Sequence, residues 1–453
     1  MLQPKFFIQT YGCQMNVHDT ERMAGLLESN NCQRTPSADN ADVVIINTCA
    51  VREKPERKLF AELGRLRKLK LKKPEMLIAV AGCMAPRDGD IIRQKAPWVD
   101  ILLGPRSLHR LPDLIRKIDI QRKSIDAVDL FDDPTPITPV SRAGTLCAWV
   151  DVMFGCSFSC AFCAVPTARG KEVSRKPDEI LDEVRELSNL GYQEITLLGQ
   201  TVNAYGRDWH YRIPGDDRQI DFAYLLEQID KIAPHMRIRF TSPHPQLFNQ
   251  RLINAVKDLP SVCEHIHLPL QSADNTVLKR MKRSYTWEQY KSIVDNLRAA
   301  IPNISITTDI IVGFPGESEE QFEKTLRAVE EIQFDQAFMF IYSPRRHTEA
   351  LNYQDEELPK EVSTRRLQEL ISLANDVFSK KNKNLVGNIY EVLIEGPSEK
   401  NPDRLCGRTR CNKMVVFAPP KDISDEDIAS LTGNRVRIKT TRGFLWGFEG
   451  VME

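Results

Sequence analysis

The segment AWVDVMFGCSFSCAFC, residues 148–163, decides the interpretation of this chain. Its first part, Ala148–Met153, is a short apolar run typical of a buried strand, and a loop containing Cys156, Cys160 and Cys163 follows directly. Three thiolates on one tight loop can hold three corners of a 4Fe–4S cube, because cysteine thiolates are the usual ligands of such clusters. The fourth iron is then open to bind a small molecule.

Five more strand-like runs follow this loop, and helical stretches lie between them. One of these stretches, Pro177–Leu190, has proline near its start, apolar residues on one face and Gly191 as its stop. The runs are Ile195–Gly199, Arg237–Thr241, His265–Pro269, Ser305–Val312 and Gln336–Tyr342. Together with Ala148–Met153 they predict an incomplete parallel (β/α)6 barrel, with its chemistry at the carboxyl ends of the strands.

The first 120 residues also have the pattern of βα units. The strand-like runs are Lys5–Tyr11, Val43–Asn47 and Met76–Ala81. Right-handed crossovers place such strands side by side in an open parallel sheet, with their carboxyl ends at one edge. Cys13, Cys49 and Cys83 each stand within two residues of a strand end. We therefore expect three thiols from distant parts of the sequence to meet in the crevice where open α/β sheets bind ligands.

Each group of three cysteines also has a simpler interpretation than an iron–sulfur site. Zinc sites usually combine paired C-x2-C units with a fourth ligand, whereas the loop Cys156–Cys163 has three cysteines and no nearby histidine. Cys13, Cys49 and Cys83 can also be buried structural thiols, because a free cysteine behaves as a small apolar residue. Their shared placement at strand ends favours a common site. The histidines without ligand spacing, predicted to be packing or surface residues, are His244, His267 and His347.

The composition excludes several classes of protein. The chain has 453 residues, 42% of them hydrophobic, and 62 basic residues balance 62 acidic ones. This length predicts about three domains, and no apolar run approaches the roughly 18 residues of a membrane-spanning helix. The start lacks the pattern of a secretory signal, so we expect a cytoplasmic protein whose 11 cysteines are thiols or metal ligands. Because the net charge is zero, a nucleic-acid partner needs a local basic patch.

Breaks in these patterns predict the domain boundaries. The segment Phe131–Thr145 is rich in proline and has no helical period, which is typical of a linker. The predicted division is 1–120 for the N-terminal domain, 121–145 for the linker, 146–384 for the barrel and 385–453 for the C-terminal domain. A helix over Pro359–Val386 leads into the last domain.

The C-terminal domain is predicted to be a small antiparallel β-barrel, because short strand-like runs alternate with turn residues. The runs are Tyr390–Glu395, Lys413–Phe417 and Asn434–Lys439. Its charges are segregated, with acidic residues gathered in one loop, namely Asp422, Asp425, Glu426 and Asp427. The basic residues expected on one face are Arg408, Arg410, Lys413, Arg435, Arg437 and Lys439. That face is predicted to be locally basic despite the neutral sum.

Six pieces of the sequence occur in a specific order. They are TYGCQMN (10–16), NTCAVREK (47–54), AGCMA (81–85), the cysteine loop with Arg169 and Gly170, DIIVGFPGE (309–317) and GRTRCNK (407–413). Together they resemble the radical SAM methylthiotransferase family over essentially the whole chain. The resemblance implies an N-terminal methylthiotransferase domain, a radical SAM barrel and a C-terminal TRAM domain. Pro55 stands where alanine is usual and His347 where glycine is usual, which leaves all six cysteines unchanged.

This resemblance implies an enzyme that generates a radical. Cys156, Cys160 and Cys163 would hold a 4Fe–4S cluster whose open iron binds S-adenosylmethionine through its amino and carboxylate groups. One electron then yields methionine and a 5′-deoxyadenosyl radical. Such a radical is needed if the target is C2 of adenine, because its hydrogen is not acidic.

A second cluster is implied at the other three cysteines. Cys13, Cys49 and Cys83 would hold an auxiliary 4Fe–4S or 3Fe–4S cluster that supplies sulfur. One S-adenosylmethionine would methylate a sulfur, and a second would activate C2 for transfer of the methylthio group. Within the family the chain is most similar to members that modify an isopentenylated adenosine beside the anticodon of tRNA.

Cofactor contacts are predicted from placement alone. Gln200, Asn203 and Glu317 follow barrel strands and are candidates for binding S-adenosylmethionine at the barrel mouth. Arg169 and Arg175 are candidates for pairing with its carboxylate. Solvated loop residues are the alternative for all five.

RNA contacts are predicted in the C-terminal domain. Sequence-specific RNA binding usually targets unpaired bases, and a base that undergoes chemistry is turned out of its stack. The predicted contacts are Arg408, Arg410, Asn412 and Lys413, assisted by aromatic residues such as Phe417 or Trp446. A solvated turn with core aromatics is the alternative.

Two further functions stay open at this point. The same chemistry can act on a threonylcarbamoylated adenosine or on an aspartate of a ribosomal protein. In a different class, the chain can be a non-enzymatic iron–sulfur electron carrier or RNA-binding scaffold. The partners implied by the preferred function are tRNA, a one-electron reductant such as flavodoxin or ferredoxin, and a protein that delivers sulfur or clusters, with the chain acting as a monomer away from membranes.

Overall fold

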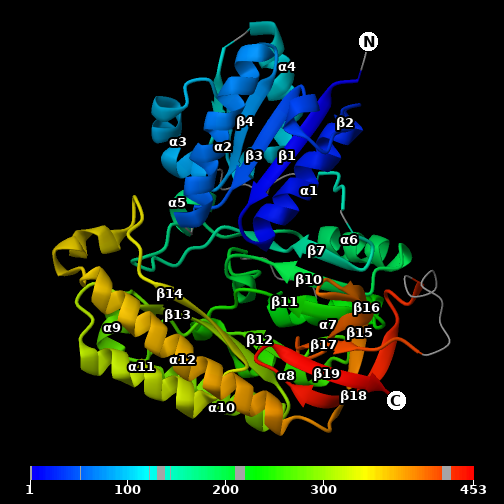
Figure 1. Cartoon of the computed structure of the whole chain (residues 1–453), viewed down its shortest axis with the longest axis vertical. Coiled ribbons are helices and arrows are strands. Elements are labelled where there is room, and N and C mark those ends of the chain that lie inside the picture. Colours follow the sequence, from blue (N-terminus) through cyan, green and yellow to red (C-terminus); the bar gives the residue numbers. More distant parts are fainter. Residues whose placement is uncertain are drawn as a thin grey trace.

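The computed structural model describes residues 3–50, 53–121, 123–129, 138–142, 144–209, 220–420 and 430–453. Figure 1 shows an N-terminal α/β sheet at the top, a parallel barrel in the middle and a small C-terminal β-barrel below it. Part of the predicted linker, including 130–137, and the acidic loop around Asp425 lie outside the described residues, as do Val51 and Arg52. Among the described helices, none has the length and apolarity needed to cross a membrane.

The N-terminal sheet has six parallel strands in the order β2-β1-β3-β4-β5-β6. Their bounds are β1 Lys5–Tyr11, β2 Gln33–Arg34, β3 Val43–Thr48, β4 Leu77–Gly82, β5 Ile101–Leu103 and β6 Ile125–Ala127. The helices are α1 Gln14–Ser29, α2 Glu53–Lys72, α3 Met84–Lys95 and α4 Leu111–Gln121. One face packs against α1 and α4 and the other against α2 and α3. Every residue of β3 and β4 is therefore buried, as expected of a parallel sheet covered on both faces.

The three predicted strands of this sheet correspond to β1, β3 and β4. Strands β2, β5 and β6 were not predicted, because two or three residues are too few to show a period. Strand β6 extends the sheet beyond residue 120, into the segment that was predicted to be linker. Beyond it, Ser141 donates from its backbone to the carbonyl of Glu21 at 2.9 Å, so the chain passes beside α1 before it enters the barrel.

The central barrel confirms the predicted incomplete (β/α)6 architecture. Its strands form two parallel sheets, β11-β10-β7 and β12-β13-β14, which meet at a parallel bridge between Ile238 and Val262. The strands are β7 Cys147–Asp151, β10 Glu194–Leu198, β11 Arg237–Phe240, β12 His265–His267, β13 Ser305–Val312 and β14 Gln336–Ile341. Among the described strands no pairing joins β7 to β14, so the barrel is open on that side.

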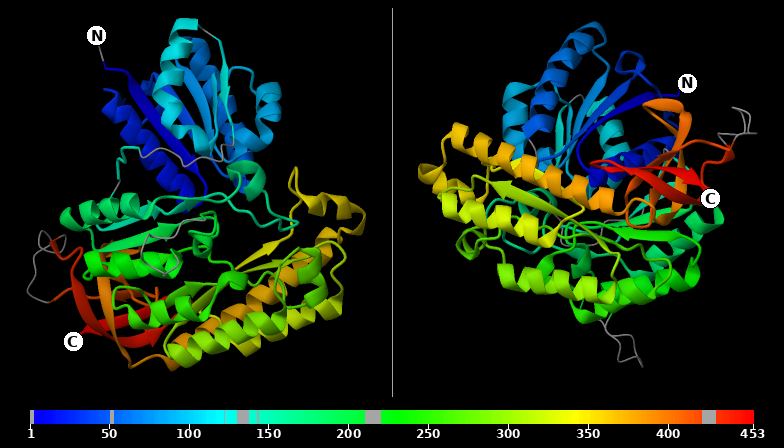
Figure 2. Two further views of the ribbon diagram at one scale, coloured as in Figure 1. Left: turned by 180° about the vertical axis from the view of Figure 1, so that it is seen from behind. Right: turned by 60° about the horizontal axis from the view of Figure 1, so that its bottom comes forward.

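Helices surround the strands of the barrel (Figure 2). They are α6 Pro177–Asn189, α7 Phe222–Ile232, α8 Gln250–Asp258, α10 Trp287–Ala300, α11 Glu319–Ile332 and α12 Lys360–Asn384. Shorter elements of this region are β8 Met153–Phe154, α5 Val165–Arg169, β9 Val173–Ser174 and α9 Asn275–Arg280. Apolar residues of the strands and helices form one continuous core. The predicted helices Pro177–Leu190 and Pro359–Val386 correspond to α6 and α12.

The C-terminal domain is a closed five-stranded barrel in the order β15-β16-β17-β19-β18. Its strands are β15 Ile389–Ser398, β16 Asn401–Thr409, β17 Met414–Phe417, β18 Arg435–Gly443 and β19 Gly447–Met452. The pairing is antiparallel as predicted, except that β17 and β19 are parallel. Strands β16 and β19 were not predicted.

This small barrel lies against the amino ends of the central strands. Arg237, the first residue of β11, donates to the carbonyl oxygen of Arg408 at 2.8 Å. The Lys413 ammonium lies 2.8 Å from the carboxylate of Asp335, which immediately precedes β14. The C-terminal barrel and the N-terminal sheet therefore occupy opposite ends of the central barrel (Figures 1 and 2).

Candidate functional site

The structure brings Cys13, Cys49 and Cys83 together at the carboxyl edge of the N-terminal sheet. They directly follow the adjacent parallel strands β1, β3 and β4 or lie one residue beyond. The Cys49 backbone donates to the carbonyl of Tyr11 at 2.9 Å, which joins two of the three loops. The hydrogen bond with Cys49 lowers the pKa of Cys13 to about 6 although burial opposes it, whereas burial raises the pKa of Cys83.

Two buried asparagines hold this edge in shape. Nδ2 of Asn47 donates to the backbone carbonyl of Asn16 at 2.7 Å, and Nδ2 of Asn16 donates to Oδ1 of Asn47 at 3.2 Å. Oδ1 of Asn16 in turn accepts from the Cys13 thiol at 3.4 Å. Gly12 and Gly82 leave room for this pair, since a Cβ at either position would collide with an asparagine side chain. Sequence reasoning missed the pair, although asparagine three residues after Cys13 and glycine before two of the cysteines were visible signals.

The cysteine loop forms the second trio, above the carboxyl end of β7. Sγ of Cys156 lies 3.0 Å from Oγ1 of Thr201, and Sγ of Cys163 accepts from the backbone of Val165 at 3.5 Å. Sγ of Cys160 accepts from Arg283 at 3.3 Å. Burial raises the pKa of Cys163 to about 12. A metal ligand must be a thiolate, so metal binding here displaces protons.

Arg169 connects the two trios. It ends helix α5 (Val165–Arg169), which lies between the N-terminal sheet and the barrel (Figure 1) and starts two residues after Cys163. Its Nε donates to Sγ of Cys83 at 3.2 Å, and its Nη2 donates to Asp19 at 2.6 Å. Burial alone would lower the pKa of Arg169, but the negative charge of Asp19 and the Cys83 thiol raise it well above its usual value. One buried cation therefore holds the cysteine loop against the N-terminal trio.

A stacked ring pair fixes the tip of the cysteine loop. Phe158 lies parallel to the imidazole of His244, with ring centroids 3.9 Å apart and an angle of 7° between planes. Tyr285 contacts the edge of the same imidazole, at 5.8 Å between centroids. Burial lowers the pKa of His244 to about 2, so the ring is neutral. His244 was predicted to be a packing or surface residue, and it packs against the functional loop.

The predicted cofactor contacts differ in whether their side chains have an unused hydrogen-bonding group. Oε1 of Gln200 accepts from the backbone of Gly155, and its buried Nε2 has no partner among the described residues. Asn203 is occupied by the backbone of His244, with hydrogen bonds of 3.0 and 2.8 Å. Gln200, at the mouth of the barrel, therefore has an unused hydrogen-bond donor in Nε2.

The remaining predicted cofactor residues pair mainly with protein groups. Arg169 pairs with Asp19, while its buried Nη1 has no partner among the described residues, so its predicted contact with a cofactor carboxylate stays a prediction. Arg175 donates to Glu183 at 2.8 Å and to the backbone of Asp151 at 2.6 Å.

Glu317 has a structural role of the same kind. It accepts from the Gly313 backbone at 2.7 Å and from Arg366 at 2.9 Å, and is 4% exposed. These pairings form because each side chain is buried where only a protein partner can satisfy its charge or hydrogen-bonding groups.

The predicted RNA-binding cations pair with carboxylates, Arg410 and Lys413 across the contact with the central barrel and Arg408 within the C-terminal barrel. Their role in RNA binding stays a prediction. Arg410 donates to both carboxylate oxygens of Glu264, at 2.7 and 2.9 Å, and Arg408 pairs with Glu395 at 2.9 Å. Lys413 is 7% exposed and pairs with Asp335.

Asn412 occupies the left-handed turn of the same hairpin, at φ 63°. Phe417 belongs to the core, and Trp446 is 53% exposed. The other half of the predicted basic face, Arg435, Arg437 and Lys439, is exposed on β18.

Part of the inner face of the central barrel stays accessible near the carboxyl end of β12. His267 lies 3.3 Å from Asp309, and its ring contacts Phe338 edge-on at 5.9 Å. Phe338 is 44% exposed, whereas Ile306 and Ile310, on the opposite face of β13, are fully buried. An inner face that stays accessible can receive a small molecule.

Both trios supply three cysteines, the residue type that ligates iron–sulfur clusters. Within the described ranges, no three histidine, cysteine, aspartate or glutamate side chains converge to hold one metal ion. Cluster thiolates bind different irons and need not converge on one point. An arginine also touches one thiol of each trio, the buried Arg169 at Cys83 and the partly buried Arg283 at Cys160. This positive charge balances ligands that are anionic when metal is bound.

Comparisons with known proteins agree with this arrangement. Residues 150–329 match the radical SAM superfamily, and residues 5–104 match the uncharacterized protein family UPF0004. The chain is 45% identical to the tRNA-2-methylthio-N(6)-dimethylallyladenosine synthase of Bacillus cytotoxicus over 449 residues, which are 98% of this chain and 85% of that protein. It is 43% identical to the protein of the same name from Bacillus subtilis, over 99% of this chain and 86% of that protein.

Solved structures share the fold at low sequence identity. The radical S-adenosylmethionine methyltransferase TsrM from Kitasatospora setae has a TM-score of 0.52 and 12% identity, over 77% of each chain. The cobalamin-dependent S-adenosylmethionine radical enzyme OxsB has a TM-score of 0.53 and 12% identity, over 80% of this chain and 56% of that chain.

Proposed function

Because this chain belongs to the tRNA-2-methylthio-N(6)-dimethylallyladenosine synthase family, we propose that it transfers a methylthio group to C2 of N6-dimethylallyladenosine beside the anticodon of tRNA. The observation that carries this proposal is the contact of buried Arg169, six residues after the cysteine loop, with the N-terminal trio. Cys83 belongs to the N-terminal domain and Arg169 to the barrel, and Nε of Arg169 lies 3.2 Å from the Cys83 sulfur. A reaction that needs two sulfur-ligated centres on one base requires such an arrangement.

Cys156, Cys160 and Cys163 are proposed to hold the 4Fe–4S cluster. When bound with S-adenosylmethionine, a cluster with an open iron supplies a radical that can act on C2 of adenine, whose hydrogen no side-chain base removes near neutral pH. The chain orients this site through the stack of Phe158 on His244. The free Nε2 of Gln200 is proposed to donate a hydrogen bond to S-adenosylmethionine.

Cys13, Cys49 and Cys83 are proposed to hold the auxiliary cluster, which supplies the sulfur. The asparagine pair behind them keeps the three loops in register, and Arg169 presents the trio toward the barrel. The N-terminal domain thereby also covers the barrel mouth and limits access of water to the reacting base. The nucleobase is proposed to enter between the two trios, above the accessible inner face that includes Asp309 and Phe338.

Partners follow from the proposed chemistry. The proposed substrate is tRNA that already carries the isopentenyl group, and each round needs a one-electron reductant such as flavodoxin or ferredoxin and a source of new sulfur. We propose that a single chain suffices, because both trios come from one chain. The cytoplasmic location predicted from the sequence stays a prediction.

Mass spectrometry of tRNA nucleosides from cells that lack this protein tests the proposed function. We expect the 2-methylthio derivative of N6-dimethylallyladenosine to disappear and its unmethylthiolated precursor to accumulate. Retention of that derivative, with loss of a methylthio group from threonylcarbamoyladenosine or from a ribosomal aspartate, would instead establish one of the sister targets.

The iron content tests the second cluster separately. Anaerobically reconstituted protein is expected to hold about eight irons, from two clusters of about four. A value near four in a folded protein that still cleaves S-adenosylmethionine would refute the auxiliary cluster.

A further inference from the structure

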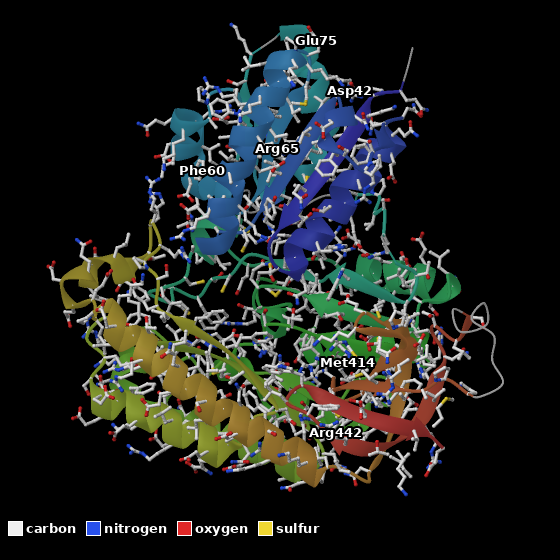
Figure 3. All side chains as sticks on the ribbon, in the orientation of Figure 1. Asp42, Phe60, Arg65, Glu75, Met414 and Arg442 are labelled. Atoms are coloured by element: carbon white, nitrogen blue, oxygen red, sulfur yellow. The ribbon has the colours of Figure 1, made fainter. Side chains whose placement is uncertain are left out.

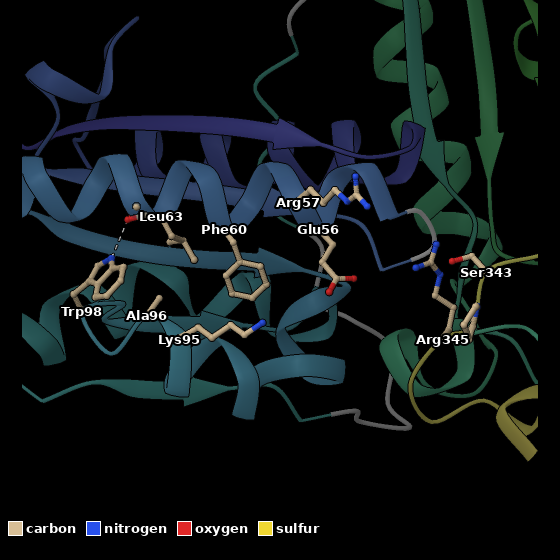
Figure 4. A pocket seen from close by; sticks show the side chains of 11 residues that line it. Glu56, Arg57, Phe60, Leu63, Lys95, Ala96, Trp98, Ser343 and Arg345 are labelled. Atoms are coloured by element: carbon tan, nitrogen blue, oxygen red, sulfur yellow. Dashed lines mark hydrogen bonds between the residues drawn. The ribbon is translucent and has the colours of Figure 1, made fainter. Parts of the chain in front are cut away.

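An open cleft of about 890 Å³ lies outside both trios, where the N-terminal domain meets the segment after β14 (Figure 4). Helix α2 supplies Glu56, Phe60 and Gly64 to one wall. The segment 95–98 at the end of α3 forms a second wall, and residues 343–345 close the inner end. Two domains therefore build one site, and a ligand in it would contact both.

Aromatic rings and cations are paired in this cleft. Nζ of Lys95 lies 4.9 Å from the centre of the Phe60 ring, and the Arg67 guanidinium lies 5.0 Å from the centre of the Trp98 ring. The indole of Trp98 is held by a hydrogen bond of 3.1 Å to the carbonyl of Leu63, drawn as a dashed line in Figure 4. A nucleotide needs an aromatic face for its base and a nearby cation for its phosphate. Phe60 has such a cation within the cleft lining, Lys95, and Trp98 has Arg67 beside it on α2, outside the lining.

The charged residues that line the cleft are mainly basic, although the whole chain is neutral. The lining includes Arg57, Lys95 and Arg345. Glu56 is the one carboxylate among the described residues that line the cleft, and it pairs with Arg87 at 3.5 Å. The cleft therefore offers a positive field to an anionic ligand.

The inner end of the cleft is connected to both trios. Arg87, which contacts Glu56, also donates to the carbonyl of Ala50, the residue after Cys49. On the barrel side, Arg346 joins the segment after β14 to Asp90 of α3 at 3.2 Å. The backbone of Ala350 then donates to the carbonyl of Ala161 in the cysteine loop at 2.8 Å.

We propose that this cleft binds unpaired nucleotides of the RNA substrate, next to the base that enters between the trios. The proposal rests on the proposed function and adds the place where the RNA is held. From Glu56 to Gly64 the helix rises roughly 12 Å, so the wall can contact a short run of unpaired nucleotides. Unpaired RNA is recognised by stacking on aromatic rings and by cations along its backbone.

This site lies far from the predicted one. Figure 3 places Phe60 and Arg65 on α2 in the upper part of the molecule, and Met414 and Arg442 in the C-terminal barrel at the lower end. The arginines expected to bind RNA there, Arg408 and Arg410, are paired with glutamates. The cleft has its rings and cations on the same side of the barrel as the trios.

Fluorescence anisotropy of a labelled anticodon stem-loop RNA, with the reconstituted full-length enzyme, tests the proposal. Phe60→Leu keeps the apolar packing and removes the aromatic face, so we expect an affinity about 10-fold lower. Lys95→Gln removes one cation, so the slope of log K against log salt should fall by about 0.7. Trp287→Leu, a half-buried aromatic position on α10 stacked on Tyr290, is the matched control and should bind like the wild type.

A footprint supports the affinity data without relying on a variant. Hydroxyl-radical oxidation of Phe60 and Trp98 should decrease several-fold when the stem-loop is bound, while oxidation of Trp287 stays the same. The proposed RNA site would be overturned if the variants keep the affinity and salt slope of the wild type and the oxidation of Phe60 and Trp98 does not change. If the enzyme still converts isopentenylated tRNA, the proposed function stays intact. Loss of reduction by an acidic flavin protein, with RNA binding unchanged, would assign the cleft to a protein and also overturn the proposal. Protection at Phe60 in a wild-type enzyme that makes no methylthio product would support the cleft and overturn the proposed function alone.

Discussion

The two cysteine trios reach similar ends by different routes. Cys156, Cys160 and Cys163 lie within one loop of the chain, so the local sequence alone brings them together. Cys13, Cys49 and Cys83 are separated by 36 and 34 residues and meet because three neighbouring strands end at one edge. The first trio is thus a motif, and the second is a product of the fold.

The surroundings of the trios differ as well. A hydrogen bond with Cys49 and the charge of Arg169 stabilise the Cys13 thiolate and lower its pKa to about 6. In the loop, burial raises the pKa of Cys163 to about 12, and Arg283 beside Cys160 is the cation that balances charge. The protein therefore stabilises the thiolate of Cys13 in the N-terminal trio, whereas burial raises the pKa of Cys83 in that trio and of Cys163 in the loop.

The largest effects are expected from removing one cysteine of each trio. Cys156→Ala should reduce formation of 5′-deoxyadenosine to background, because the loop then has two ligands. Cys49→Ala should leave part of that activity and abolish methylthiolation, and both variants should retain about half of the iron. Liquid chromatography of 5′-deoxyadenosine and modified nucleosides measures the difference. If Cys49→Ala still makes the methylthio product, the division of labour between the trios is wrong.

Breaking the connection between the trios should cost stability. Arg169→Ala leaves Asp19 buried without its partner, and both side chains are almost inaccessible, so we expect a loss of about 3–5 kcal/mol in the free energy of unfolding. Arg185→Ala removes an exposed pair with Asp182 and should cost only about 0–1 kcal/mol. Urea unfolding followed by tryptophan fluorescence compares the two variants. Equal losses would contradict a central role for Arg169.

Glycines beside the trios should be sensitive to a single methyl group. Gly82 (φ 91°) and Gly155 (φ 71°) adopt left-handed backbone, and a Cβ would meet Asn47 at the first and the Lys171 carbonyl at the second. Alanine at either position should cost about 1–3 kcal/mol. Gly64→Ala in α2, where nothing lies within 4 Å of the new atom, should instead stabilise by about 0.5–1 kcal/mol. Thermal and urea unfolding of the three variants test this contrast, and a neutral Gly82→Ala would show that the edge can relax.

The smallest effect is expected at Thr201, whose hydroxyl lies 3.0 Å from the Cys156 sulfur. Thr201→Val keeps the shape and removes one hydrogen bond, which should cost about 1 kcal/mol in urea unfolding of the cluster-free protein. The iron content after reconstitution should stay near that of the wild type, because a thiolate ligand needs no hydroxyl partner. A variant that fails to take up iron at the loop would show that Thr201 does more than support Cys156.

Much of the fold could be predicted, because hydrophobic periodicity is a local property. The apolar runs that became β3 and β4 and the helix that became α12 carried their pattern in the sequence. Strand β16, with its polar start Asn401–Arg404, and the three-residue strands β5 and β6 form only because a neighbouring strand offers hydrogen bonds. Such pairing leaves no mark on a short segment.

The sequence by itself determined which side chains are the candidate iron ligands, through the spacing of the cysteine loop and the placement of three cysteines at strand ends. Only the tertiary structure decided how charged side chains are used. Arg169 forms an ion pair with Asp19, and Arg410 forms an ion pair with Glu264. A motif acts through neighbours in the chain, whereas the partner of a buried cation depends on which surfaces meet when domains pack, and no local pattern encodes that choice.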